Sequence, residues 1–142
     1  ELFGDNNYKS QEIFSLIETN DKIFKYHLDR FKYASRFSKN ELETHRDACM
    51  KILLSLNKRL ENFSNQGKSL FLVNAKETIA DWAIWPFVRQ FRIADITQFD
   101  QNDDLKFLIN WLNHYFAQKK YQIVMKKNEP WNKQIEPLFL RE

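Results

Sequence analysis

The chain has 142 residues, a length that suits one domain with a substantial hydrophobic core. Its 22 basic and 19 acidic residues leave a net charge of +3, which is typical of a soluble surface and gives little support to nucleic-acid binding. The mean hydropathy of −0.63 and the lack of a long uncharged apolar run exclude a membrane-spanning helix.

Glycine, proline and cysteine are scarce. Two Gly and three Pro favour long helices over many tight turns. The single cysteine, Cys49, excludes an internal disulfide and is typical of a reducing compartment, so we expect a cytoplasmic protein. Because the first residue is Glu1 and not Met, we also expect that the sequence is a piece of a longer chain.

Residues 1–9 are polar around Gly4 and are interpreted as a lead-in or linker, followed by a single helical domain over residues 10–142. Ser10 is suited to cap a first helix, along which apolar residues recur at helical spacing. These residues are Ile13, Leu16, Ile17, Ile23, Phe24, Leu28 and Phe31. Residues 19–21 interrupt the stripe, and we expect a kink there, or a break where Asn20 or Asp21 caps a new helix.

The end of this segment is dense in aromatic and basic residues. In a helix, Tyr26, Arg30 and Tyr33 share one side. Together with Arg36 they have two interpretations. They form a solvated helix end whose cations complement the helix dipole, or the wall of a cleft that receives an anionic or aromatic ligand.

A second helix is predicted from Ser38, because Ser38 and Glu41 have the spacing of a capping box and Gly67 is suited to a left-handed turn at the end. Its apolar stripe consists of Leu42, His45, Cys49, Ile52, Leu53, Leu56, Leu60 and Phe63. We interpret Cys49 as a buried, unreactive thiol. The three histidines, His27, His45 and His114, lie far apart and lack metal-ligand spacing, so no metal site is expected.

A third helix begins with the clearest local signal in the chain. Thr78 can accept from the N–H of Asp81, and Asp81 can accept from the N–H of Thr78, so we assign both to a structural cap. Glu77 precedes the cap, at the position where a hydrophobic staple would require an apolar residue. Further along, Trp85, Arg89 and Arg92 form a second basic and aromatic side, for which core packing and ion pairing are the favoured explanation.

The remaining chain is predicted as a connector, two helices and a tail. Residues 92–100 carry two expected apolar anchors, Ile96 and Phe99, and Asp100 or Asn102 is suited to cap the next helix. That helix places Leu105, Leu108, Leu112 and Tyr115 on one face, broadened by Phe107 and Trp111. A short helix over residues 119–127 follows, and an irregular tail around residues 130–140 is expected to fold back on the body.

Two stretches carry a family resemblance. The Thr78–Asp81 cap opening an apolar helix with Pro86 inside it resembles the core helix of the C-terminal domain of glutathione S-transferases. The first helix is similar to a Leu-Asp-Arg-Tyr-Lys-Tyr-Pro-x-Arg-Tyr segment of bacterial members of that family. The matching residues are Leu28, Asp29, Arg30, Lys32, Tyr33 and Arg36, whereas Phe31, Ala34 and Phe37 depart from it.

The periodicity alone supports an all-α bundle of five or six helices. The resemblance extends over nearly the whole chain, from about residue 10 to about residue 131. It implies that the domain supplies the electrophile pocket and part of a homodimer interface, with Tyr26, Arg30, Tyr33 and Arg36 binding a hydrophobic or aromatic acceptor. The family's glutathione site and thiol-activating group belong mainly to a preceding thioredoxin-like domain. These residues contain no βαβ pattern, so glutathione is expected as cosubstrate of an intact parent, while this chain alone is expected to be inactive and to hold no cofactor.

A different class of function is the alternative. Domains similar to this one are fused to translation factors and tRNA synthetases, where their helical faces dock other proteins. The sequence is therefore also compatible with a non-catalytic interaction module that binds a protein partner and does not depend on glutathione. Neither a membrane nor a nucleic acid is expected as a partner.

Overall fold

A computed structural model of the chain describes residues 7–33, 38–67 and 70–124, and the side chains of residues 7, 8 and 39 are not described. Every regular element in these ranges is helical. The elements are α1 (Asn7–Thr19), the π-helical turn η1 (Asn20–Phe24), α2 (Lys25–Lys32), α3 (Lys39–Asn65), α4 (Ile79–Ala94), α5 (Ile96–Asp100), the 3₁₀ turn η3 (Asp103–Leu105), α6 (Lys106–Phe116) and α7 (Lys119–Val124). The predicted all-α class is confirmed.

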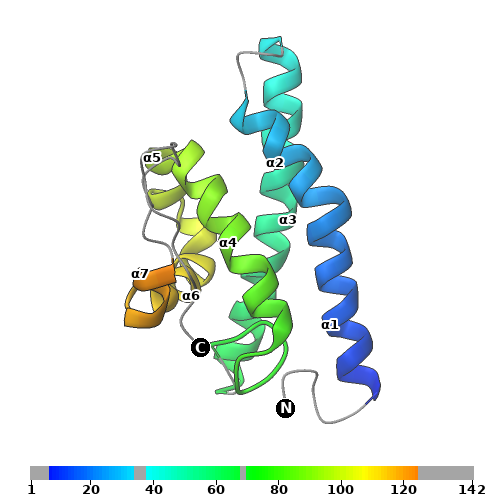
Figure 1. The fold of residues 1–142 in the computed structure, drawn as a ribbon, viewed down its shortest axis with the longest axis vertical. Helices are drawn as coiled ribbons and strands as arrows, with labels where there is room; N and C mark the ends of the chain where they lie inside the picture. Colours follow the sequence, from blue (N-terminus) through cyan, green and yellow to red (C-terminus); the bar gives the residue numbers. More distant parts are fainter. Residues whose placement is uncertain (1–6, 34–37, 68–69, 125–142) are drawn as a thin grey trace, which may run out of the picture.

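Figure 1 shows α1, η1 and α2 continuing into one another as one long helical segment that runs alongside α3. The helix α4 contacts both α1 and α2, and α6 packs against α3 and α4. The core lies between these long helices and is lined by residues such as Ile13, Phe24, Leu53, Val88 and Trp111. None of the described helices combines the length and apolar character that a membrane span requires.

The first helical segment corrects two predictions. It begins at Asn7, so Ser10 lies inside α1 and does not cap it. No new helix starts at Asn20 or Asp21, because Thr19 keeps helical backbone angles and the N–H of Lys25 bonds to the carbonyl of Asn20 in a wider, π-type turn. Asn20 lies seven residues after Ile13 and is buried, as Ile13 is. The buried face of the helix therefore continues through Asn20, although a polar residue at this position looks like a break in the apolar pattern of the sequence.

The predicted start and end of α3 are confirmed. Ser38 accepts from the N–H of Glu41 at 3.4 Å, and the Glu41 carboxylate accepts from the N–H of Ser38 at 2.9 Å. After the helix, Gly67 has a φ of 65°, the left-handed conformation that favours glycine. Cys49 lies on the buried stripe, and burial raises the pKa of its thiol to about 12, in agreement with an unreactive side chain.

The cap of α4 forms as predicted and reaches further than predicted. Both halves of the capping box are present, with the N–H of Thr78 donating to Asp81 Oδ2 at 2.9 Å. The Thr78 hydroxyl donates to the same oxygen at 2.9 Å. The other oxygen, Oδ1, accepts from the N–H of Leu72 at 2.9 Å and from the indole N–H of Trp111 at 3.0 Å. A polar contact replaces the staple, since Trp82 Nε1 donates to Glu77 Oε2 at 3.0 Å.

The backbone N–H groups in the first turn of α6 donate hydrogen bonds to a residue of another helix. Asn57 is buried on α3, and its Oδ1 accepts from the N–H groups of Phe107 and Leu108 at 2.9 and 3.0 Å. The predicted local cap is also present, because Asn102 Oδ1 accepts from the N–H of Asp104 at 3.0 Å. A hydrogen bond to Asn102 therefore fixes the start of η3, and hydrogen bonds to Asn57 of α3 fix the start of α6.

The region after α4 contains one wrong anchor. Phe99 is fully buried, but Ile96 is 51% exposed and does not anchor the connector. The reason is that α4 continues to Ala94 and α5 starts at Ile96, a geometry that turns Phe99 inward towards Phe91, with ring centroids 6.2 Å apart. The described part of the last helix ends at Val124, and the predicted tail over residues 130–140 lies outside the described residues.

Removing the two capping hydroxyls should have unequal effects. We expect Thr78→Ala to lower the free energy of unfolding by about 2 kcal/mol, because the lost hydroxyl leaves a buried carboxylate with one donor fewer. Ser38→Ala at the exposed cap of α3 should cost about 1 kcal/mol. Chemical denaturation measures both, with Thr78→Ser as the matched control that keeps the hydroxyl. Equal losses at the two caps would contradict the central role of Thr78.

Candidate functional site

Two of the predicted site residues contact each other on α2. The guanidinium carbon of Arg30 lies 3.5 Å from the centre of the Tyr26 ring, and Arg30 Nη1 donates to the carbonyl of Tyr26 at 3.2 Å. Tyr33 follows the last turn of α2, and its N–H donates to the carbonyl of Asp29 at 3.1 Å. Its ring is half exposed and lies 5.7 Å from Lys32 Nζ. Arg36, the fourth predicted residue, lies outside the described residues.

A pair of histidines joins this cluster, which sequence reasoning missed. His27 Nδ1 lies 2.8 Å from His45 Nδ1, and the Tyr26 ring meets both imidazoles edge-on at centroid distances of 5.0 and 6.0 Å. The histidines are far apart in sequence but not in space, because α2 packs against α3. Among the residues described, no group of three or more His, Cys, Asp or Glu side chains is arranged so that it could hold a metal ion.

The histidine contact requires a particular protonation state. A bond between two Nδ1 atoms needs one N–H donor and one free lone pair, so one and only one of these two nitrogens carries a proton when the bond is intact. Burial lowers the pKa of His27, and the nearby His45 and Arg30 lower it further. The contact between α2 and α3 at this point is therefore favoured by neutral imidazole.

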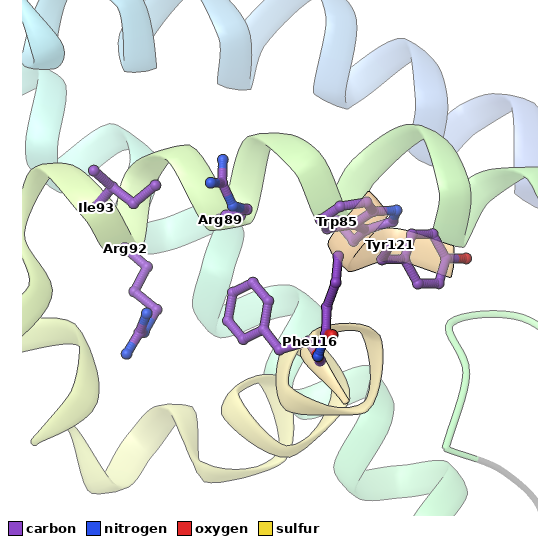
Figure 2. A pocket seen from close by; sticks show the side chains of 7 residues that line it. Trp85, Arg89, Arg92, Ile93, Phe116 and Tyr121 are labelled. Atoms are coloured by element: carbon purple, nitrogen blue, oxygen red, sulfur yellow. The ribbon is translucent and has the colours of Figure 1, made fainter. Parts of the chain in front are cut away.

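A second candidate site lies on the other side of α4. A cavity of about 490 Å³ opens between α4 and the α6–α7 corner (Figure 2). It is lined by Trp85, Arg89, Arg92, Ile93, Phe116, Tyr121 and Gln122. Trp85 is buried and stacks on Tyr115 with ring centroids 5.4 Å apart, while Arg92 makes a two-pronged ion pair with Asp100 at 2.7 and 2.6 Å. Core packing and ion pairing explain these two residues, as predicted.

Arg89 differs from its neighbours. It is half-buried and lines the cavity, yet it makes no hydrogen bond or ion pair with another described residue. Asp100 of α5 is paired with Arg92. A half-buried cation among aromatic side chains has lost part of its hydration, and its guanidinium can pair with a carboxylate or another anion.

The comparisons with known proteins bear on the fold. No protein-family model matches the chain, and no curated protein does so. A crystal structure of a glutathione transferase family member from Pseudomonas fluorescens Pf-5, with two glutathione bound, is similar to it with a TM-score of 0.71 and 16% sequence identity. The fold is glutathione transferase-like. The similarity covers 87% of this chain and 55% of that one, so the chain spans little more than half of its structural neighbour.

The histidine pair predicts a pH dependence of stability. The folded-state pKa of His27 lies below its ordinary value of 6.5, so the unfolded chain binds the proton more readily. The free energy of unfolding should therefore fall as the pH decreases from about 7 to about 5.5, and His27→Asn should weaken this dependence. Denaturation at several pH values measures the effect. If the variant showed the same pH dependence of the free energy of unfolding, protonation of His27 would not be coupled to folding.

Proposed function

We propose that the chain is the helical domain of a glutathione transferase-like protein that conjugates glutathione to a hydrophobic or aromatic electrophile. The observation that carries this proposal is the similarity of fold over 87% of the chain to a glutathione transferase family member with glutathione bound. In the reaction, the thiolate sulfur of glutathione forms a bond to the electrophilic carbon and a leaving group such as halide departs. The glutathione site and its activating group belong to a preceding thioredoxin-like domain in this proposal, so the chain alone is inactive.

The electrophile pocket is assigned to α2. Arg30 is stacked on Tyr26 and spends one N–H on a backbone carbonyl, which leaves further guanidinium donors for an anionic group. Tyr33 is half exposed and supplies a ring face and a hydroxyl. An acceptor that combines an aromatic ring with a carboxylate or nitro group suits these side chains, with Arg36 adding a second cation.

The preceding domain is proposed to cover the cavity beside α4. Two large apolar side chains of that helix, Trp82 and Ile93, are about half exposed, and Arg89 lies between them in sequence. A partner surface that places an apolar side chain in the cavity and a carboxylate beside Arg89 would bury the apolar surface and pair the cation. The length of the structural neighbour, of which this chain matches 55%, supports a further domain as the occupant. A homodimer and a cytoplasmic location also stay predictions, and no finding favours the non-catalytic interaction module.

The pocket assignment is tested by kinetics of the intact parent. With glutathione and an aryl chloride that bears a carboxylate, we expect Arg30→Ala to raise KM for the acceptor about tenfold and Tyr33→Phe about threefold. The KM for glutathione should not change. Lys58→Ala, an exposed cation of α3, is the control and should leave both constants at the parental value. Unchanged acceptor kinetics in both site variants would refute the assignment, and no conjugate at all would refute the proposed function.

The docking assignment is tested by comparing two chain lengths. In the intact parent, we expect Ile93→Asp to lower the melting temperature by several degrees, roughly the effect of 1–2 kcal/mol, because a charge would be buried at the contact between domains. The same change in the helical domain alone should have little effect, since the side chain is 56% exposed there. Ile23→Asp, at a side chain of similar exposure on η1, is the control. A loss that is equal in both chain lengths would contradict docking at this surface.

A further inference from the structure

Another cavity lies at the π-helical turn, where α1 and η1 face α3. Its volume is about 230 Å³, and it shares no lining residue with the α4 cavity or with the Tyr26–Arg30 cluster. Its wall is apolar at Leu16, Phe24, Ile52, Leu56 and Ile84 and polar at Thr19, Asn20, Lys51 and Ser55. Neither the proposed electrophile pocket nor the proposed domain contact uses this cavity.

One polar group in the wall lacks a partner. Asn20 lines the cavity and is only 3% exposed, and its Oδ1 has no hydrogen-bond partner among the described residues. The orientation of the amide is determined by its other end, because Nδ2 donates to Asp21 Oδ1 at 3.1 Å. Reversing the amide would place its oxygen against that carboxylate. The acceptor beside the cavity is therefore Oδ1, and it is buried without a donor.

The backbone at this position is unusual as well. Asn20 is the first residue of η1, and π-type turns inside α-helices are rare and frequent at functional sites. The neighbouring hydroxyl offers no alternative donor, since Thr19 Oγ1 already donates to the carbonyl of Ser15 at 3.0 Å. A buried acceptor is normally satisfied by the protein or by a bound molecule, and here the described protein does not supply the donor.

The size and polarity of the cavity decide what fits it. Besides its aliphatic and aromatic side chains, the wall carries one unsatisfied buried acceptor, Asn20 Oδ1, and the polar side chains of Thr19, Lys51 and Ser55, of which the last two are exposed to solvent. An apolar cavity of roughly 150 Å³ holds benzene, so about 230 Å³ admits a slightly larger molecule with one polar group. We propose that the cavity at the π-turn binds a small neutral apolar molecule that carries a single hydroxyl or amine donor, such as a phenol, and that the donor bonds to Asn20 Oδ1.

The test compares phenol with toluene, which has nearly the same shape but no donor. Binding of each to the full-length protein is measured by titration followed by NMR, for the wild type and for Asn20→Leu. Asn20→Leu should weaken phenol binding about tenfold, the value of one hydrogen bond, and change toluene binding less than about twofold. The control, Asn110→Leu, changes an exposed amide of α6 and should affect neither ligand.

A second variant is needed in case Asn20→Leu perturbs the π-helical turn η1. Ile52→Phe adds volume to the cavity wall from α3 and should abolish binding of both molecules while Asn20 is unchanged. Shifted resonances should belong to residues around Asn20 and Ile52. Phenol binding that Asn20→Leu leaves unchanged, equal losses of phenol and toluene in that variant, or no binding of phenol at millimolar concentration would each overturn the proposal. Because neither ligand is an electrophile or a thiol, these outcomes do not depend on whether the protein conjugates glutathione.

Discussion

The helical bundle depends on the hydrogen bonds that the buried carboxylate of Asp81 accepts. This side chain is fully buried, and transferring a carboxylate out of water is costly unless donors replace the lost hydration. Four donors do so, from the backbone of Leu72 and of Thr78, from the Thr78 hydroxyl and from the indole of Trp111. Burial raises the pKa of Asp81, and these hydrogen bonds act in the opposite direction. One side chain thus connects the segment before α4, the first turn of α4 and the middle of α6.

This connection also determines which side of α4 faces the core and which side faces the cavity. Once its first turn is fixed between Leu72 and Trp111, the phase of the helix sends Val88 and Phe91 into the core. The same phase leaves Arg89 and Ile93 on the opposite side, at the cavity that faces the α6–α7 corner. The basic and aromatic character of that cavity therefore follows from how a buried carboxylate orients one helix.

Local signals were sufficient to predict much of the fold. The caps at Ser38, Thr78 and Asn102 were predictable because each partner lies two or three residues away, and the long apolar stripes indicated the helices themselves. Contacts between residues far apart in the sequence have no local sequence signal and were not predicted. The His27–His45 pair and the bond from Trp111 to Asp81 join residues 18 and 30 positions apart. Asn20 was misjudged for a related reason, since a polar residue on a buried face looks like an interruption until the surrounding packing is known. Of the proposed pocket, the sequence indicated Tyr26 and Arg30 as neighbours on one helix face, but not the imidazoles beside them.

The amide of Asn57 has a consequence for the order of folding. α6 has 11 residues, and an isolated helix of that length is marginal in water because starting it is costly. Two of its first N–H groups bond to a side chain 50 and 51 positions earlier, on α3. The hydrogen bonds at the beginning of α6 are complete only when α3 is in place, so we expect α3 to form before α6 during folding. We therefore expect the α6–α7 corner, which lines the α4 cavity, to form after α3.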